Sequence, residues 1–125
     1  MNLLLDTHVV LWWRADAERI APSVREVIGS ADTVFVSVAS AWEVAIKQAL
    51  GKVRLPETFA AGVDRSGFAR LTITFEHAAA AATLPPHHSD PFDRMLVAQA
   101  VAEGLRLVTA DHTLARYEAD VLLAR

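Results

Sequence analysis

The sequence contains no cysteine, only five glycines and five prolines, and no long uninterrupted apolar run. Without cysteine the chain has no disulfide framework, no thiolate nucleophile and no zinc-ribbon site, and this fits a reducing cytoplasm. Asp6 interrupts the opening apolar segment and no basic region precedes it, so the pattern predicts neither a signal peptide nor a membrane-spanning helix. We therefore expect a cytoplasmic protein without a membrane partner.

The residues that are present have the composition of a globular protein. Of the 125 residues, 53% are hydrophobic and 22% are charged. A chain of this length buries roughly two thirds of the surface that its unfolded form exposes, so one core is enough. We expect residues 1–125 to form a single domain. The net charge of −3 argues weakly against a nucleic-acid partner, since phosphate binding usually needs a basic surface.

The predicted fold is organised around the apolar segment at residues 2–8. Leu3, Leu4 and Leu5 in succession suit a strand covered on both faces, as in a parallel α/β sheet. Such sheets bind ligands just beyond the carboxyl ends of their strands, which is where Asp6 stands. The patterns predict further strands at 33–37, 105–109 and 121–123, a strand or the exit of a strand at 71–75, and helices at 8–14, 22–30, 37–50, 57–65, 76–84 and 92–103.

Two adjacent tryptophans, Trp12 and Trp13, lie in the first predicted helix, for which Thr7 is a candidate N-cap. Adjacent side chains on a helix point about 100° apart, so the two rings are not expected to face the same core. One of them should therefore lie near the surface. It is either a half-exposed core residue or part of a face that docks another protein, where aromatic side chains are enriched.

Four acids near helix starts each have an ordinary structural explanation. Glu43 completes a Ser-Ala-Trp-Glu capping box at 40–43 and has a lysine four residues on. Asp90 is a candidate N-cap, and Asp93 follows as residue N3, where a carboxylate favours the helix dipole. Asp111 would cap a short helix after the strand at 105–109. Each of these acids alone is weak evidence for a site.

The joint placement of the acids is more informative. Asp6 and Asp111 end two predicted strands, whereas Glu43 and Asp93 lie in the first turns of two helices that start at the same edge of the sheet. Asp93 also shares a helix face with apolar residues, so its carboxylate points inward and needs a partner. Carboxylates about 4 Å apart repel by roughly 4 kcal/mol at a moderate dielectric, so such a cluster implies cations.

A cluster made only of carboxylates indicates which metal and which chemistry to expect. Oxygen ligands suit Mg²⁺ or Mn²⁺, and many phosphodiester-cleaving sites use carboxylate-held ions to orient water and to stabilise the attacking and leaving oxygens. Such ions also answer the objection from net charge, because a negative protein can hold a polyanion through them. The basic residues expected to touch phosphates are Lys47, Lys52, Arg54 and Arg94.

Four segments, in this order, resemble the PIN domain, and in particular VapC-type toxins of bacterial toxin–antitoxin pairs. The resemblance runs from Leu3 to Asp111, nearly the whole chain. Single motifs are unspecific, but four in order are a strong signal. The segments are Leu-Leu-Leu-Asp-Thr-His at 3–8, Ser-x-x-Ser-x-Trp-Glu-x-x-x-Lys at 37–47, Asp-Pro-Phe-Asp-Arg-Met-Leu-Val-Ala-Gln-Ala at 90–100 and Leu-Val-Thr-Ala-Asp at 107–111.

The resemblance implies a three-layer α/β/α sandwich with a central, mainly parallel sheet. It also implies a Mg²⁺-dependent endoribonuclease, with Mn²⁺ as a substitute, that forms a homodimer and is blocked by a small antitoxin. By motif position Asp6, Glu43 and Asp93 carry over as the main catalytic metal ligands. Asp111 carries over as a fourth ligand that acts directly or through water, and Asp90 either makes an outer contact or only caps its helix.

Three other functions fit parts of the sequence. The five histidines raise a transition-metal hydrolase, but His87 and His88 are adjacent on a loop and no histidine pair has helical i,i+4 spacing. A phosphoacceptor role for Asp6 would need an acid one residue before it or two after it, where Leu5 and His8 stand. The remaining alternative is a catalytically silent PIN-like module that binds RNA or a partner, and a metal-dependent cleavage assay separates it from the enzyme.

Overall fold

The computed structural model describes residues 1–125, and its centre is strand β1 (Asn2–Leu5). Leu3, Leu4 and Leu5 have no exposed surface, as expected for a strand covered on both faces. The sheet order is β3-β2-β1-β4-β5, and every neighbouring pair is parallel. The other strands are β2 (Thr33–Ser37), β3 (Ala69–Leu71), β4 (Arg106–Thr109) and β5 (Val121–Leu123).

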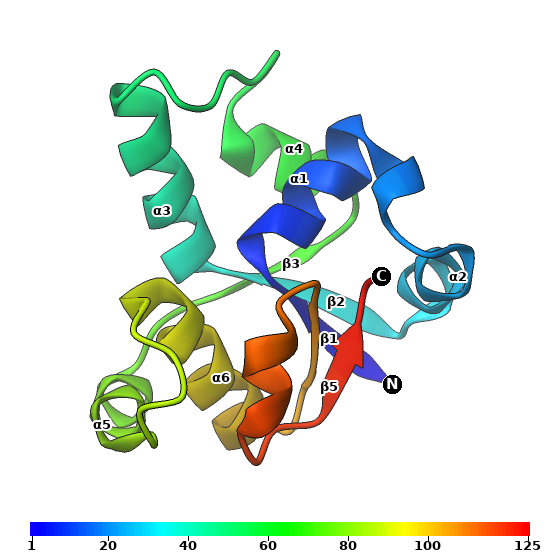
Figure 1. Cartoon of the computed structure of the whole chain (residues 1–125). Coiled ribbons are helices and arrows are strands. Elements are labelled where there is room, and N and C mark those ends of the chain that lie inside the picture. The colour runs from blue at the N-terminus through cyan, green and yellow to red at the C-terminus, as the bar shows by residue number, and fades with distance from the viewer.

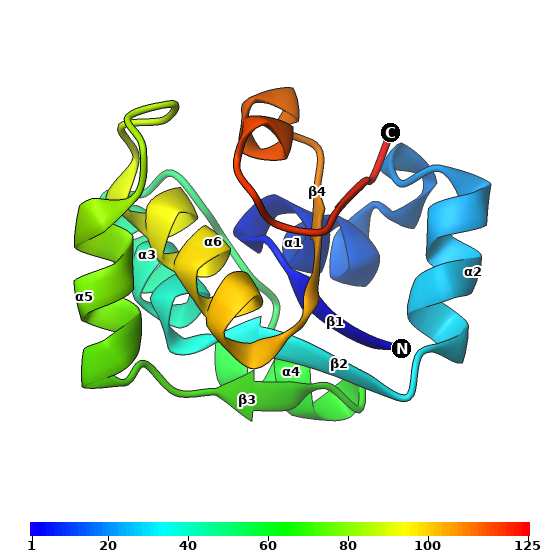
Figure 2. The same ribbon diagram turned by 90° about the horizontal axis from the view of Figure 1, so that it is seen from below.

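Helices cover both faces of this sheet, which confirms the predicted α/β/α sandwich (Figures 1 and 2). They are α1 (Thr7–Ala15), α2 (Pro22–Ser30), α3 (Val38–Ala49), α4 (Phe59–Arg65), α5 (Phe75–Thr83) and α6 (Pro91–Glu103), with 3-10 turns η1 (Ala17–Arg19) and η2 (His112–Arg116). Leu3 and Leu5 face a core shared with α1, α2 and α4, whereas Leu4 faces a core shared with α3, α6 and η2. No helix has the length and apolar character needed to cross a membrane.

The chain order reverses beside β1, because β2 lies on one side of it and β4 on the other. Leu5 pairs with Val36 in β2 and with Val108 in β4, so the three strands end at the same edge. Asp6 follows β1 at this edge, and Thr109 is the last residue of β4. The carboxyl edge at such a switch point is where open parallel sheets bind ligands.

Asp6 begins α1 as its N-cap. One of its carboxylate oxygens accepts the N–H of Val9 at 2.9 Å. The prediction that Thr7 is the cap is wrong, because Asp6, one residue earlier, already supplies the acceptor. The hydroxyl of Thr7 is thereby available for a contact elsewhere.

Helix α3 is capped by Ser37, the last residue of β2, whose hydroxyl accepts the N–H of Ala39 at 3.0 Å. The predicted capping box of Ser40 and Glu43 is therefore wrong. The helix has already begun at Val38, so the backbone N–H groups that such a box would satisfy lie inside the helix. The side chain of Glu43 consequently has no capping role.

Helix α6 matches its prediction. The carboxylate of Asp90 accepts the N–H groups of Phe92 and Asp93, and Pro91 occupies the first helical position. Gly104 ends the helix in the left-handed conformation, at a φ of 66° that other residues adopt only with strain. The Asp90 cap fixes Asp93 in the first turn of the helix, at the edge of the sheet.

The segment 71–75, predicted as a strand or the exit of a strand, is the exit, because β3 lies at Ala69–Leu71. Thr74 instead caps α5, where its hydroxyl accepts the N–H of His77 while the His77 ring accepts the N–H of Thr74. This reciprocal pair starts the helix at Phe75 and leaves no room for a longer strand.

Trp12 and Trp13 are both partly buried and both pack against the core that lies between β1 and α1. The Trp13 ring lies 6.0 Å from that of Phe68, centroid to centroid. The prediction that the two rings would not share a core is wrong. That core contacts α1 on more than one side, because it includes both Ile20 and Val63. Two side chains about 100° apart on the helix can therefore both reach it.

Candidate functional site

A hollow of about 300 Å³ opens at the carboxyl edge of the sheet, between the ends of β1 and β4. Its wall combines three of the four predicted acids with two aromatic side chains. The lining residues are Asp6, His8, Trp12, Asp93, Ala110 and Asp111. Glu43 is buried and does not line the hollow, although its charge acts on both Asp6 and Asp93.

Asp6 is held rigidly at the base of this hollow and is only 4% exposed. One carboxylate oxygen accepts the Val9 N–H, and the other accepts the Thr109 hydroxyl. Burial raises the pKa of Asp6 above its usual value, and the charge of Glu43 adds to this, while the two hydrogen bonds and the nearby His8 oppose it. Burial outweighs the hydrogen bonds, so this carboxylate lacks a full counter-charge.

Glu43 is fixed by a small buried network. Its Oε1 lies 2.6 Å from the Thr7 hydroxyl, which is also 2.9 Å from that of Ser40. A hydroxyl has a single proton, and a carboxylate is the stronger acceptor, so Thr7 donates to Glu43 and accepts from Ser40. The other oxygen, Oε2, pairs with Lys47 at 3.0 Å, as the sequence spacing predicts. Thr7 thus joins Glu43 to the turn that carries Asp6.

Asp93 has the most perturbed acid–base equilibrium of the site. The pKa of Asp93 is raised from 3.8 to about 7, chiefly by burial; the charges of Asp90, Asp6 and Glu43 contribute to this rise, and His88 opposes it. Its carboxylate therefore shares one region with other acids that repel it. Such an arrangement favours either a proton or a cation at this position.

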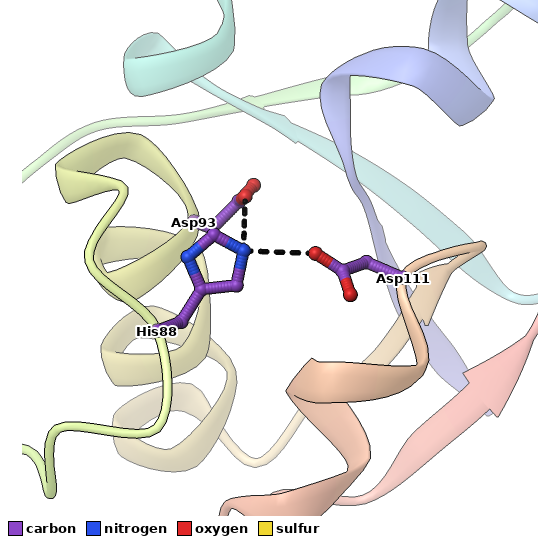
Figure 3. Close-up of side chains that lie close together, drawn as sticks. All are labelled: His88, Asp93 and Asp111. Carbon is purple, nitrogen blue, oxygen red and sulfur yellow. Dashed lines mark hydrogen bonds and ion pairs between the residues drawn. The ribbon is translucent and has the colours of Figure 1, made fainter.

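His88 lies between Asp93 and Asp111, as Figure 3 shows. Its Nε2 is 2.8 Å from Asp111 Oδ2 and 3.3 Å from Asp93 Oδ2, and the three ligand-type atoms all lie within 4.8 Å of one another. Partial burial raises the pKa of Asp111, but hydrogen bonds from the Thr113 backbone and from His88 outweigh it, so the net shift is downward. Asp111 also caps η2 by accepting the Thr113 N–H, as predicted.

The tautomer of His88 decides whether it can hold a metal in this arrangement. Its Nδ1 accepts the backbone N–H of Asp90 at 3.0 Å. A ring nitrogen that accepts carries no proton, so the proton of the neutral ring is on Nε2. Nε2 therefore donates its proton to Asp111, with the Asp93 carboxylate 3.3 Å from the same nitrogen, and the side chain acts here as a hydrogen-bond donor between acids rather than as a ligand.

Arg94 has a structural role that differs from its predicted one. Its guanidinium donates to four backbone carbonyls, those of Ala81, Leu84, Pro85 and His88, at 2.9 to 3.3 Å. These bonds tie the end of α5 and the loop before α6 to one side chain. The prediction that Arg94 touches phosphates is wrong, because its donors already have partners within the protein.

The residues of the hollow fit a hard divalent cation. All three acids on its wall offer carboxylate oxygens, which Mg²⁺ and Mn²⁺ prefer. Protein donors occupy some of their lone pairs, and each carboxylate has about four. Burial, with a smaller contribution from neighbouring carboxylates, raises the pKa of Asp6 and Asp93, and a bound cation would offset this cost.

Sequence reasoning missed the side chains that hold the acids in place. Thr7 and Thr109 each lie within two residues of an acid, yet their hydroxyls bind a different acid far away in sequence. The sequence suggests His88 only as a metal ligand, although its position two residues before the N-cap Asp90 is a local signal that its ring can accept the Asp90 N–H. The long-range partners depend on strand register, which no local pattern records.

The fold and the hollow define the class of protein: an open parallel α/β sheet with an acid-lined hollow at its switch point. The chain matches the PIN domain over residues 3–120, and it belongs to that family. It is 32% identical to Ribonuclease VapC22 of Mycobacterium tuberculosis over 116 residues, which cover 90% of this chain and 89% of that protein.

Solved structures of low sequence identity share the fold. A toxin–antitoxin complex from Klebsiella pneumoniae has a TM-score of 0.71 at 14% identity, with 98% of each chain covered. VapBC2 from Rickettsia felis, bound to a DNA fragment from its promoter, has a TM-score of 0.70 at 15% identity, with 98% of this chain and 97% of that chain covered.

Proposed function

We propose that this chain is a metal-dependent endoribonuclease and the toxin of a toxin–antitoxin pair. The observation that carries the proposal is the convergence of Asp6, Asp93 and Asp111 on one hollow, with the pKa of two of them raised. The 32% identity to Ribonuclease VapC22 supports RNA as the substrate. We also propose that residues 1–125 act as one PIN domain in the cytoplasm.

The chain's own residues would hold the ligands and set their charge. Asp6, Asp93 and Asp111 would bind Mg²⁺, or Mn²⁺ in its place, with Glu43 acting from its buried position through water or after a small shift. When bound, such an ion lowers the pKa of a water molecule and offsets charge on the phosphate. The hydroxyls of Thr7 and Thr109 keep two carboxylates oriented, because each donates to one carboxylate oxygen.

The chemistry expected from such a site is hydrolysis. Water attacks phosphorus, the bond to the 3′ oxygen breaks, and the products carry a 5′-phosphate and a 3′-hydroxyl. No side chain of the hollow is a nucleophile of the Cys or Ser-His type. Asp90 serves its helix, because one of its carboxylate oxygens accepts two backbone N–H groups, so we assign it no direct contact with metal.

A protein partner would lie beside this hollow. A second, more apolar groove of about 340 Å³ runs between α1 and residues 53–63, and Trp12 lines both hollows. We propose that an antitoxin segment binds in this groove and reaches the acids. The solved complexes that share the fold include toxin–antitoxin assemblies, which supports this partner.

The proposed homodimer also needs an apolar face, and α3 offers one. Val38, Trp42 and Ile46 follow one another at i,i+4 spacing, and they are 43%, 63% and 38% exposed. A stripe of this kind is unusual on a monomer, where large apolar side chains rarely gather on one helix face. We propose that it is buried in the homodimer.

The experiment is cleavage of single-stranded RNA by the purified protein with Mg²⁺, with Mn²⁺ and with excess EDTA. We expect cleavage with either ion, none in EDTA, and 5′-phosphate ends on the products. Asp6→Asn, Glu43→Gln and Asp93→Asn should each nearly abolish cleavage, whereas Asp111→Asn should reduce it less, because that acid is the least buried.

The matched control is Asp64→Asn, which removes a surface carboxylate that pairs with Arg70 and does not line the hollow. It should cleave like the unmodified protein. Undiminished activity in EDTA, or a 2′,3′-cyclic phosphate product, would contradict the metal-dependent mechanism. RNA binding without any cleavage would support the catalytically silent module instead.

A further inference from the structure

The acid hollow is lined by two aromatic side chains as well as by carboxylates. His8 and Trp12 stand at i and i+4 on α1, with ring centroids 6.2 Å apart and planes tilted by 46°. We propose that these two rings form a stacking platform for an unpaired nucleobase next to the phosphodiester that is cut. The inference rests on the proposed ribonuclease function and adds a substrate feature to it.

Trp12 differs from its neighbour in what its ring meets. The Trp13 ring packs on Phe68 in the core. The Trp12 ring packs against that core as well, but it also borders the hollow, together with the exposed side chain of His8. A core role explains Trp13 completely, whereas it leaves the position of Trp12 and His8 beside the acids unexplained.

Two guanidinium groups lie over the Trp12 ring and are part of the platform, and their charge favours a polyanion. The guanidinium carbon of Arg19 lies 5.1 Å from the Trp12 ring centroid, and that of Arg125 lies 5.4 Å from it. Arg125 makes no ion pair with a carboxylate, and the nearest carboxylate of Arg19 is 3.6 Å away, in Asp16. Other cations are more tightly engaged: Lys47 binds Glu43 at 3.0 Å, Arg70 binds Asp64 at 2.9 Å and Arg94 binds carbonyls.

These features match a nucleotide better than a peptide. A base stacks on tryptophan, on histidine or on the plane of a guanidinium, and its phosphates pair with arginine. The acids of the same hollow would lie beside one phosphate, so the base on the platform belongs to a nucleotide next to the cut. The platform therefore selects RNA in which that nucleotide is unpaired, since a base inside a duplex is not free to stack there.

The test is a double-mutant cycle between the protein and the RNA. Binding of a labelled single-stranded RNA is measured by fluorescence anisotropy, with each position in turn replaced by an abasic nucleotide. All proteins carry Asp93→Asn so that the RNA stays intact, and Mg²⁺ is present. At one position the abasic change should weaken binding about tenfold, and Trp12→Leu should remove that difference because it removes the same contact.

Two further variants keep the result interpretable. His8→Ala changes an exposed side chain and cannot fail through loss of core packing, and it should show the same coupling, more weakly. Trp12→Phe keeps an aromatic face and should retain most of the effect. The control is Phe75→Leu, which removes an aromatic ring that is 94% exposed and lies outside the hollow; it should show no coupling at any position.

The proposal is overturned if Trp12→Leu and His8→Ala weaken binding equally for intact and abasic RNA, or do not weaken it at all. Loss of affinity for an antitoxin without any coupling to RNA would make Trp12 a protein-docking residue only. Because binding is measured in a variant that is not expected to cut, failure of the platform is distinct from failure of the ribonuclease proposal. The latter is judged separately by cleavage with the unmodified protein.

Discussion

Replacing Asp93 by asparagine should stabilise the metal-free protein, and by an amount that depends on pH. The pKa of Asp93 rises from 3.8 in the unfolded chain to about 7 in the folded protein. Between these values the folded state binds more protons than the unfolded state, so stability falls as the pH rises from about 4 to about 7. Above that range the folded protein carries the full cost of an unneutralised carboxylate, and asparagine removes it.

The size of the effect follows from the shift. Each pKa unit corresponds to about 1.4 kcal/mol, so the shift from 3.8 to about 7 gives an upper limit of about 4 kcal/mol. The carboxylate is not fully buried, since 22% of the side chain is exposed, and water screens the charges that act on it. We therefore expect Asp93→Asn to raise the free energy of unfolding by about 2 kcal/mol at about pH 8, and by almost nothing at about pH 4.

The assay is urea unfolding followed by circular dichroism, with excess EDTA throughout, at a series of pH values. The difference between the variant and the unmodified protein is the quantity of interest, because it cancels the other titrating groups. Asp111→Asn is the matched comparison: the pKa of Asp111 is lowered, so its charge stabilises the folded protein and its removal should cause a small loss at high pH.

The reasoning fails if Asp93→Asn lowers the stability at high pH. That result would mean that the carboxylate at residue N3 serves chiefly the dipole of α6, which is the ordinary structural explanation of its position. A gain that did not vary with pH would also contradict it, because a gain from removed charge must vanish where the carboxylate is already protonated.

Two further predictions concern side chains that hold the site. Thr7→Val keeps the shape of the side chain but removes the donor to Glu43. It should weaken Mn²⁺ binding by about tenfold in titration calorimetry and leave the fold intact, since a hydrogen bond to a charged group contributes about 1.5 to 3 kcal/mol. Unchanged affinity would exclude Thr7 from the site. Arg94→Met removes the donors to four backbone carbonyls and should lower the free energy of unfolding, measured in urea, by about 3 kcal/mol. Arg94→Lys should restore only part of this stability, because lysine cannot reproduce the planar guanidinium. Full restoration by lysine would show that charge alone matters at this position.

Much of the fold can be predicted from local sequence patterns, because buried strands and helix ends depend mainly on neighbouring residues. The Leu3 to Leu5 run predicts a strand buried on both faces, and Asp90 and Gly104 mark the ends of α6, since each feature concerns neighbouring residues only. The wrong predictions of element boundaries occur at positions where two neighbouring polar residues compete to cap a helix. Thr74 starts α5 through His77 and thereby shortens the preceding strand, and periodicity alone does not show which of two adjacent polar residues becomes the cap.

The candidate site divides in the same way. That Asp6, Asp93 and Asp111 meet could be predicted, because parallel strands place their carboxyl ends together and a helix start follows each end. The orientation of their oxygens could not. It depends on Thr109 reaching across from β4 to Asp6 and on His88 reaching Asp111, and both contacts are set by the register of strands and loops in space.

These orienting contacts also explain how the protein tolerates its acids without a cation. Asp6 and Asp111 each serve as a helix cap, so part of the energy lost to repulsion is recovered by satisfying backbone N–H groups. Asp93 has no such second role, and its pKa is the one that rises to about 7. A cation that bound only the folded state would remove this remaining cost and stabilise the fold by mass action. The acid without a structural role should therefore be the one that couples folding to metal most strongly.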